Sequence, residues 1–409
     1  MNTAMRIAIV GYGTAGQALA VALSRDGHRV EVFERVPEPG PVGAGFLLQP
    51  TGLSALWELG LLDAALRHGA VVTRLFGETV AARPVMDMRY RELHPALFGL
   101  GMQRGAIFRL LDAAWTQDRR LHCGREIAHV DHERGVLRDT HGDEHGPYDL
   151  IAVADGAASK LRAEIGEVAF DRPYPWGAQW CLVAAGDWPW RDELRQRYRR
   201  ARRMAGMLPV GTRPDDPVPR LSFFWSLPAS QLAEAGRDAA RWREALAEVW
   251  PEALDSLRDT VVPDGLAQAR YRDTVLRRWH RGRAVLVGDS AHAMSPQLGQ
   301  GANMALVDAL ALRDALRDAD NVPMALDAYQ RARRAHLSAY HFWSRWLTPM
   351  FQSDHDSIAM MRDAVFHPMS RIPGGRGQML RVLTGTRRGW LGTWPLQKAF
   401  LEALMARIA

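Results

Sequence analysis

The chain has 409 residues, of which 47% are hydrophobic and 24% charged, and its net charge is +6. This length exceeds one typical hydrophobic core, so we expect two closely packed domains, and the composition excludes a disordered or fibrous chain. The positive charge comes from arginine, because Lys160 and Lys398 are the only lysines.

Basic and acidic residues alternate along most of the sequence, and 191–203 is the one dense basic run. No aromatic interleaving or reading motif accompanies this run, so we expect a solvated helix face and no nucleic-acid partner. Cys123 and Cys181 form neither a disulfide framework nor a metal-ligand spacing. An apolar strand begins at Ile7, which leaves no room for a secretory signal, and no apolar run could span a bilayer. These features favour a cytoplasmic protein without a metal site.

The first predicted unit is a strand over 6–10, a glycine-rich turn, a helix over 17–25 and a second strand over 28–33. The turn reads Gly-Tyr-Gly-Thr-Ala-Gly, and an acid placed to bind a ribose follows the second strand, as in dinucleotide-binding βαβ units. The first glycine permits the turn, the second lets backbone N–H groups reach a pyrophosphate, and the third lets helix and strand pack closely. The candidate residues are Gly11, Gly13, Ala15, Gly16 and Glu34.

Loops, helices and strands alternate over the next part of the chain. Residues 37–45 form a loop, 49–62 a helix capped at Thr51 or Ser54, 75–93 strands that leave the nucleotide domain, and 103–111 a further helix. Residues 148–162 then predict a buried strand, a tight turn at Asp155-Gly156 and a helix capped at Ser159.

Aromatic-rich strands follow at 176–184, 204–209 and 221–227, separated by clusters of Pro, Gly and Asp. We expect an antiparallel sheet that covers a ligand pocket. Most of its aromatic residues belong to the sheet core, but as a set they indicate an apolar, flat cavity that suits an aromatic or polycyclic substrate. The candidate pocket residues are Trp176, Gln179, Met207, Phe223 and Trp225.

The stretch 283–308 carries the most informative motif. Residues 284–287 are typical of a buried strand, which Gly288-Asp289 ends with a turn and a carboxylate. Gly299 and Gly301 lack side chains that would block a ligand, and a helix over 303–310 follows. Its unpaired N–H groups and positive dipole end suit a negatively charged or electron-rich partner.

Further helices are predicted over 231–257, with an interruption at Pro251, and over 322–344. The prolines expected to cut the tail into short pieces are Pro349, Pro368, Pro373 and Pro395. The tail is rich in aromatic residues, among them Trp390 and Trp394. They form either a packed helical cap or a surface for a membrane-associated lipid substrate, a carrier protein or a second subunit.

Two of these stretches carry a family resemblance. The stretch from Gly288 resembles the Gly-Asp motif of the FAD-dependent aromatic hydroxylases, the single-component flavoprotein monooxygenases of the para-hydroxybenzoate hydroxylase type. The matching residues are Gly288, Asp289, Ala291, His292, Pro296, Gly299, Gln300, Gly301 and Asn303. Residues 148–162 are similar to the D-G motif of that family. Ser290 stands where relatives usually have Ala, and Val153 where they usually have Gly.

The resemblance implies an α/β fold with a Rossmann-like FAD-binding domain, an inserted antiparallel-sheet substrate domain and a C-terminal helical segment. The FAD-binding domain would comprise residues 1–74, 100–170 and 272–320. The substrate domain would comprise residues 75–99 and 171–271, and the C-terminal segment residues 321–409. The further cofactor-binding residues that it implies are Arg35, Gly45, Arg104, Asp155, Gly288, Asp289, Gly301, Ala302 and Asn303. Pro296 and Gly299 would belong to a loop beside the flavin ring, where oxygen reacts.

The implied reaction is hydroxylation of an aromatic or polycyclic small molecule with O2 and NAD(P)H, through a flavin C4a-hydroperoxide. Because only one G-x-G-x-x-G follows a strand, NAD(P)H would bind transiently, and an external reductase is the alternative. No catalytic base is identifiable from the sequence. His94, His122, Tyr174 and His292 are candidates by residue type alone, and we expect His292 to lock the motif by a hydrogen bond instead.

Three other interpretations stay open: a flavin-dependent halogenase, a flavin reductase that acts on isoprenoid double bonds, and a non-catalytic FAD-binding subunit. Against the halogenase, Trp188-Pro-Trp190 lacks the flanking residues of the halogenase motif and no lysine precedes Lys160. Oxygen consumption would exclude the reductase. NADH oxidation stimulated by an aromatic substrate would separate an enzyme from a scaffold.

Overall fold

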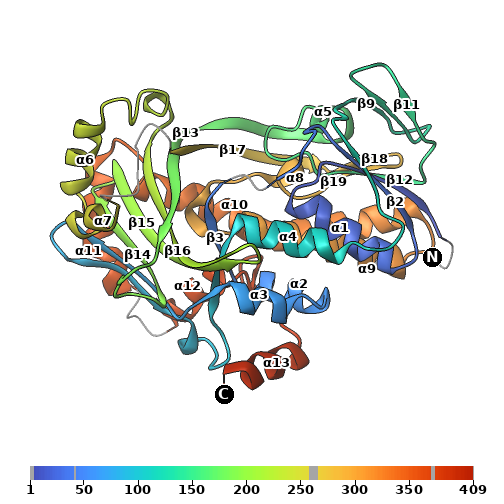
Figure 1. The fold of residues 1–409 in the computed structure, drawn as a ribbon. Coiled ribbons are helices and arrows are strands. Elements are labelled where there is room, and N and C mark those ends of the chain that lie inside the picture. The colour runs from blue at the N-terminus through green and yellow to red at the C-terminus, as the bar shows by residue number, and fades with distance from the viewer. Residues whose placement is uncertain (1–3, 41–42, 258–265, 370–373, 409) are drawn as a thin grey trace.

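Two large sheets lie side by side in the computed structural model, which describes residues 4–40, 43–257, 266–369 and 374–408. Figure 1 shows the mainly parallel sheet on the right and the antiparallel sheet on the left, with long helices running beneath both. Two long strands, β13 (Glu167–Ala184) and β17 (Ala267–Arg278), reach from one sheet to the other. The α/β architecture expected from the sequence is therefore confirmed.

The first sheet has the strand order β18-β19-β12-β1-β2-β8. Its strands are β1 (Arg6–Val10), β2 (Arg29–Glu34), β8 (Arg120–Cys123), β12 (Leu150–Val153), β18 (His280–Arg281) and β19 (Ala284–Leu286). Every pairing in it is parallel except that of β18 with β19. The buried strands predicted over 6–10 and 284–287 and within 148–162 are thus confirmed, and their apolar runs suit a parallel sheet covered on both faces.

Helices from distant parts of the chain cover this sheet. α1 (Thr14–Arg25) packs against α4 (Arg104–Ala114) and α9 (Gly301–Asp318). The other elements beside it are β3 (Gly45–Leu48), α2 (Pro50–Glu58), α3 (Leu62–His68), β4 (Ala70–Val72), β7 (Gly99–Gln103), β9 (Ile127–Asp131), β10 (Val136–Asp139), β11 (Glu144–His145), α5 (Arg162–Ile165) and α8 (Asp289–His292). The predicted helix over 49–62 is divided, and Gln49 precedes it without a side-chain cap, so capping by Thr51 or Ser54 was wrong.

The second sheet has the order β17-β13-β16-β15-β14-β5-β6 and is antiparallel except where β14 meets β5. Its remaining strands are β5 (Arg74–Thr79), β6 (Pro84–Arg89), β14 (Glu193–Arg199), β15 (Arg203–Arg213) and β16 (Asp216–Pro228). The helix face predicted for the basic run over 191–203 was wrong, because β14 occupies its centre. Arg195 stacks on Trp190 with its guanidinium 4.2 Å from the ring centroid, and Arg197 pairs with Glu78 at 2.7 Å.

The far side of this second sheet is closed by α6 (Ala239–Ala247) and α7 (Pro251–Leu257). The predicted interruption at Pro251 is confirmed, while the helix begins at Ala239 and is capped by Asp238 rather than starting near 231.

The C-terminal part consists of helices and one small hairpin. Its elements are α10 (Val322–Phe351), α11 (Asp356–Met369), α12 (Gly375–Leu383), β20 (Arg387–Arg388), β21 (Gly392–Thr393) and α13 (Lys398–Ile408). Pro349 and Pro368 do not cut their helices, because each lies in the last turn, where a missing N–H and a crowded carbonyl disturb little of the helix. Pro373 lies outside the described residues, and Pro395 separates β21 from α13.

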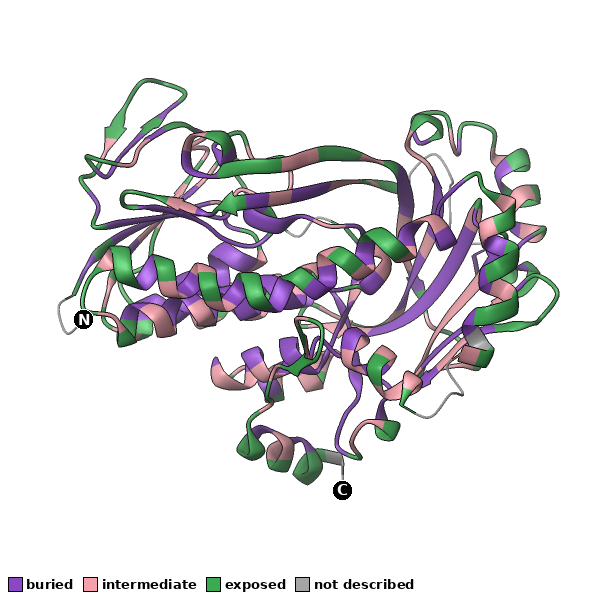
Figure 2. Cartoon of the chain, turned by 180° about the vertical axis from the view of Figure 1, so that it is seen from behind, coloured by how far each residue is buried: buried purple, intermediate pink, exposed green. Residues whose placement is uncertain are grey.

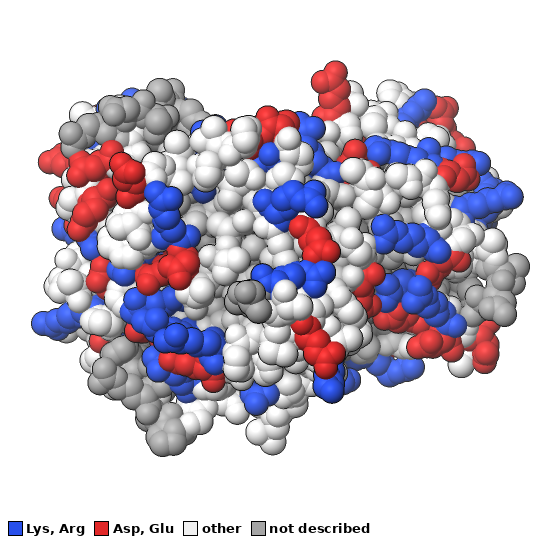
Figure 3. All heavy atoms as spheres, turned by 60° about the horizontal axis from the view of Figure 1, so that its bottom comes forward, with Lys and Arg blue, Asp and Glu red and all other residues white. Residues whose placement is uncertain are grey.

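Among the described helices, none is both long and apolar enough to cross a bilayer. Basic and acidic side chains are interspersed over the face shown in Figure 3, as the alternating sequence predicts. Figure 2 shows where burial is concentrated, in the parallel strands and in the inner side of the long helices.

Candidate functional site

The glycine-rich turn after β1 touches the strand that carries the second motif. Gly11 has φ +101°, and a Cβ there would lie 2.5 Å from the carbonyl oxygen of Ala154. A Cβ on Gly16 would lie 2.0 Å from the carbonyl oxygen of Gly11. The turn and the Asp155 segment are therefore as close as their backbones allow, and glycine is required at both positions.

The same turn leaves open space at its centre. No atom of the described chain lies within 4 Å of the position that a Cβ of Gly13 would take, and the same holds for Gly156 and Gly299. The carboxylate of Glu34 accepts the backbone N–H groups of Tyr12 and Val36 at 2.8 and 2.9 Å. A carboxylate has about four lone pairs, so Glu34 keeps acceptor capacity for ribose hydroxyls.

The Gly-Asp segment is bound to the Asp155 segment by side chains. Ser290 donates its hydroxyl to the carbonyl of Val153 at 2.7 Å, which joins the two positions that depart from the family pattern. The buried Arg162 donates to the carbonyls of Ser290 and Asp289 at 2.7 and 3.1 Å, and pairs with Asp171 at 3.0 Å. These contacts hold the two turns in a fixed relation.

Asp155 itself lies in the cleft between these segments. Its Oδ1 is buried and has no hydrogen-bond partner among the described residues. Desolvation raises the pKa of its carboxyl, and a hydrogen bond from Ser159 opposes the shift. A buried polar atom without a partner is unusual in a folded protein, so this oxygen fits a ligand group.

Helix α9 begins at Gly301 and presents the first N–H groups of its initial turn, those of Gly301, Ala302 and Asn303, beside the Gly-Asp turn. Asp289 Oδ1 lies 3.8 Å from the position of a Gly301 Cβ. The fully buried Asn303 side chain accepts the N–H of Gln49 at 2.8 Å and donates to the carbonyl of Leu47 at 3.1 Å. Its amide is therefore used to hold β3, and only its backbone N–H remains for a ligand.

Arg104 lies across the cleft from this helix. Its guanidinium is 5.6 Å from the ring centroid of Phe46, and its side chain lies against Gly43. The side chain is accessible along the open cleft, yet enough protein surrounds it for desolvation to lower its pKa, with Asp289 and Tyr271 acting in the opposite direction. The arginine therefore lies close enough to the Gly-Asp carboxylate and this tyrosine for their charges to act on it.

The near face of the second sheet closes the cleft. The hydroxyl of Ser222 accepts the N–H of Gly45 at 3.1 Å, and the rings of Trp180 and Phe224 lie 5.3 Å apart on the same face. Tyr271 lies beside Trp180. The Tyr271 hydroxyl and the Trp180 indole nitrogen are both buried, and neither makes a hydrogen bond of ordinary geometry within the described chain.

Burial raises the pKa of Tyr271 to about 12, against smaller opposing effects of Trp180 and Arg104. The phenol is therefore protonated at neutral pH and is a donor, as is the indole N–H. The indole N–H of Trp180 points to the Tyr271 oxygen, and the Tyr271 O–H itself has no acceptor within the described chain. A buried free donor next to an aromatic wall suits an aromatic ligand that carries an oxygen or nitrogen acceptor.

Four of the five predicted pocket residues face away from this cavity. Gln179 pairs with Trp225 across β13 and β16, and Phe223 pairs with Met207 across β16 and β15, so that all four side chains lie on the far face. There Gln179 accepts the indole N–H of Trp242 at 3.0 Å. Only Trp176 shares the face of Trp180. For the other four residues the predicted face of the sheet was wrong, because neighbouring residues of a strand point to opposite faces.

Trp180 and Tyr271 are the site residues that the sequence did not indicate. The alternation Ser-Phe-Phe-Trp-Ser over 222–226 shows that one face of β16 is less apolar than the other. That signal could have identified the face with hydroxyl groups as the one toward the cofactor.

The predicted base candidates are engaged elsewhere. The buried His292 lies 2.6 Å from Asp308, which confirms that it locks the motif. Tyr174 donates to Thr348 at 2.6 Å, and burial raises its pKa. His94 accepts the N–H of Ala96, and His122 stacks on Phe33 at 4.7 Å.

Arg35, a predicted cofactor-binding residue, is exposed just after the end of β2.

A buried ionic cluster supports the Gly-Asp turn from below. Asp308 of α9 accepts the N–H of Gly288 at 2.8 Å and also binds His292 and Arg333. Burial alone raises the pKa of Asp308, but His292 and Arg333 outweigh it, and the pKa is held well below its usual range. The turn is therefore fixed by an ionised carboxylate.

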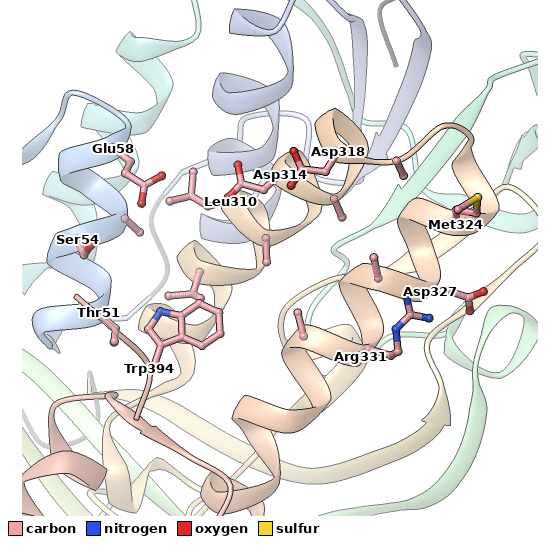
Figure 4. A pocket seen from close by; sticks show the side chains of 17 residues that line it. Thr51, Ser54, Glu58, Leu310, Asp314, Asp318, Met324, Asp327, Arg331 and Trp394 are labelled. Carbon is pink, nitrogen blue, oxygen red and sulfur yellow. The ribbon is translucent and has the colours of Figure 1, made fainter. Parts of the chain in front are cut away.

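The hollow in Figure 4, of about 600 Å3, is a different place. It lies between α2, α9 and α10, with Trp394 in its wall and Glu58, Asp314, Asp318 and Asp327 around it. None of the predicted cofactor-binding residues lines it, and we do not assign the chemistry to it.

The cleft joins a Rossmann-type turn, an acid at the end of β2 and a helix N-terminus to an aromatic sheet face. This combination defines a dinucleotide-binding oxidoreductase with its substrate space beside the cofactor. A family model described as "FAD binding domain" matches residues 4–343. The chain belongs to that family: it is an FAD-dependent monooxygenase, with FAD as its cofactor.

Similar proteins agree with this assignment. The chain is 28% identical over 382 residues to the aurachin C monooxygenase/isomerase of Stigmatella aurantiaca, covering 90% of this chain and 96% of the relative. It is 29% identical over 343 residues to an FAD-dependent urate hydroxylase of Mycolicibacterium vanbaalenii, covering 80% and 84%. In fold it resembles the 2-methyl-3-hydroxypyridine-5-carboxylic acid oxygenase, with TM-score 0.77, 24% identity and coverage of 96% and 100%.

Proposed function

We propose that the chain inserts one oxygen atom of O2 into an aromatic small molecule, with NAD(P)H as the electron donor. The second oxygen atom leaves as water, and NAD(P)H supplies the two electrons that this requires. The observation that carries the proposal is the buried Tyr271 hydroxyl, which has no acceptor in the described chain and has the Trp180 indole N–H beside it, on the sheet face that meets the cofactor cleft.

The residues of the cleft fit FAD, since they supply an open glycine turn, an unpartnered carboxylate oxygen and free helix N–H groups. Gly11, Gly13, Ala15 and Gly16 would hold the pyrophosphate, and Glu34 and Arg35 the adenosine part. Asp155, Gly288 and Asp289 would hold the middle of the cofactor, and Gly45, Arg104, Gly301, Ala302 and Asn303 the region of the ring. Bound FAD supplies the redox chemistry that activates oxygen.

The chain's own residues orient the substrate and exclude water. The rings of Trp180 and Phe224 offer a flat apolar wall, and the Tyr271 hydroxyl can donate to an acceptor on the substrate. Pro296 and Gly299 belong to the loop that precedes α9, and Gly299 has φ +60°. We place this loop beside the reacting position.

Names of several relatives support an aromatic, nitrogen-containing substrate. They include a probable 2-heptyl-3-hydroxy-4(1H)-quinolone synthase of Rhodococcus erythropolis, 27% identical over 376 residues, and kynurenine 3-monooxygenases. We propose a substrate of this general class for the present chain. A cytoplasmic location is consistent with the two free cysteines.

A substrate screen tests the reaction. The purified protein is mixed with NADH or NADPH and panels of phenols, quinolones and polyketides, and oxygen uptake is followed with mass analysis of the product. We expect one compound class to stimulate NAD(P)H oxidation and to gain one oxygen atom. Stimulated oxidation without oxygen uptake would instead indicate a reductase and overturn the proposal.

A matched pair of glycine variants tests the cofactor contacts. Gly13→Ala enters open space, so the fold is kept, but the methyl group meets the proposed pyrophosphate and weakens FAD binding by about 10- to 100-fold. Gly16→Ala clashes with the carbonyl of Gly11 and lowers the free energy of unfolding by about 1–3 kcal/mol. FAD titration and urea denaturation distinguish the two. Unchanged FAD affinity in Gly13→Ala would refute the assignment.

A further inference from the structure

A short aromatic hairpin projects from the C-terminal part of the chain. Strands β20 and β21 are joined by a turn that carries Trp390 and Leu391, with exposed fractions of 69% and 92%. Both values are high for large apolar side chains, and the two residues are adjacent in the sequence. A soluble surface rarely exposes such a pair without a use for it.

The hairpin is fixed on the outer side of α10. The N–H of Gly389 donates to the carbonyl of Ala335 at 3.1 Å, and the N–H of Arg387 donates to the Tyr340 hydroxyl at 3.1 Å. The ring of Trp390 lies 4.7 Å from that of Phe342. The position of the turn is therefore set by the structure.

The exposed apolar surface continues along α10. Phe342 and Trp346 are four residues apart and lie on one side of the helix, with exposed fractions of 40% and 42%. Figure 2 shows α10, the longest helix, crossing the near face with exposed residues along its outer side. Together with Trp390 and Leu391 these residues form what we call the aromatic ridge.

A shallow apolar groove runs beside the ridge. Its volume is about 600 Å3, and its walls include Val275, Trp279, Leu337, Phe342 and Trp346. This groove lies between α10 and β17, so apolar surface is available both on the ridge and next to it.

The charge around the ridge is positive. Arg334, Arg387 and Arg388 form no ion pair with any residue that the structure describes. Of the acids near α10, Asp273 pairs with Arg345 at 2.7 Å. Asp327, 3.1 Å from His280, keeps its negative charge because desolvation lowers the pKa of that histidine, but it lies near the start of α10, away from the hairpin. Arg387 is half-buried and its guanidinium binds Gln378 and the Gly389 carbonyl, whereas Arg334 and Arg388 are exposed. Exposed guanidinium groups beside exposed aromatic rings are complementary to an anionic surface with an apolar interior.

We propose that the aromatic ridge docks the protein on an anionic lipid bilayer, with Trp390 and Leu391 entering the interface and Arg334 and Arg388 facing acidic headgroups. Aromatic residues at the headgroup level and arginines toward anionic lipid are the arrangement that membrane interfaces favour. The binding is peripheral. It goes beyond the proposed reaction and does not depend on the identity of the substrate.

Vesicle sedimentation with the FAD-loaded full chain tests the proposal. We expect binding to vesicles that contain phosphatidylglycerol and little binding to phosphatidylcholine alone. Trp390→Ser with Leu391→Ser should lower the partition coefficient at least about tenfold, because both side chains leave the interface. Arg334→Gln with Arg388→Gln should lower it about tenfold and reduce its salt dependence.

A double variant on another helix is the matched control. Met360→Ser with Met361→Ser changes two exposed apolar residues of α11, which packs on β6, and should bind vesicles like the wild type. The flavin absorbance of each variant reports whether the fold is kept. Absence of wild-type binding to anionic vesicles, or unchanged binding of the hairpin variant, would overturn the proposal. So would light scattering that shows the hairpin variant converting a dimer to a monomer, since a second copy would then cover the ridge.

Discussion

The two faces of the seven-stranded sheet are built from the same strands but differ in how their polar groups are satisfied. On the far face Gln179 and Trp242 are hydrogen bonded to each other, and Met207, Phe223 and Trp225 are packed under α6 and α7. On the near face the polar atoms of the half-buried Trp180 and Tyr271 are buried, and apart from each other they have no partner in the described chain.

The difference indicates which face is structural and which is functional. The far-face cluster also buries two indole nitrogens without a partner, those of Trp188 and Trp250, but these are enclosed in a packed core. The near-face donors lie beside the cofactor segments instead, where a ligand can reach them. Aromatic content does not separate the two faces, but exposure does: Met207, Phe223 and Trp225 are fully buried, whereas Trp180, Phe224 and Tyr271 are half-buried.

The largest effect is expected from the far face. Trp225→Ala should lower the free energy of unfolding by about 3–5 kcal/mol, because it removes a fully buried ring from the core. FAD content and kcat/KM of the folded protein should stay within about twofold of the wild type. Urea denaturation and steady-state assays measure both. A large loss of kcat/KM with unchanged stability would assign the far face to the substrate instead.

The second largest effect is expected at the cofactor segments, where Asp308 supports the Gly-Asp turn. The pKa of Asp308 is lowered in the folded protein, so the stability that this carboxylate contributes is present above its unfolded pKa near 4 and is lost as the pH falls through and below that value. Asp308→Asn should lower the free energy of unfolding at pH 7 by about 3 kcal/mol, since Arg333 loses its buried partner.

The control for this prediction is how the free energy of unfolding of each variant depends on pH. The stability difference between Asp308→Asn and the wild type should shrink when unfolding is measured in acid, while the difference for Trp225→Ala should not. A pH-independent loss in Asp308→Asn would show that the carboxylate is not ionised in the folded protein.

A smaller and purely functional effect is expected from the near face. Tyr271→Phe removes one donor and should lower kcat/KM for the best substrate about tenfold, which corresponds to about 1.4 kcal/mol. FAD affinity should be unchanged and thermal stability nearly so, because the O–H has no acceptor within the described chain and only the weak contact from Trp180 is lost. Met207→Leu, on the far face, serves as the conservative control. Unchanged kinetics in Tyr271→Phe would show that the Tyr271 hydroxyl does not bind the substrate.

Local patterns in the sequence predicted much of the cofactor half. Strand β1 over 6–10, the turn at Gly11 and the helix that follows depend on residues close in sequence, and their chemistry requires that order. The role of His292 also followed from its place in the motif, although its partner Asp308 did not.

The sequence could not decide features that depend on distant contacts. The five predicted pocket residues are spread over three strands. Which face of the sheet each one occupies is determined only when the strands pair and one face packs against α6 and α7. The run over 191–203 was predicted to be a solvated helix face, but its alternation of arginine with other residues also fits a strand, for which the distant β5 supplies a partner. Tyr271 lies in no recognisable motif, so only its neighbours identify it.

The central claim is that three separated segments, at Gly11–Gly16, Asp155–Gly156 and Gly288–Gly301, hold one FAD. Titration of the purified, flavin-free chain with FAD, followed by flavin fluorescence, tests it most directly. The account predicts saturable binding of one FAD per chain in the wild type and much weaker binding in Gly13→Ala. A folded wild-type chain that takes up no FAD at saturating concentration would contradict it.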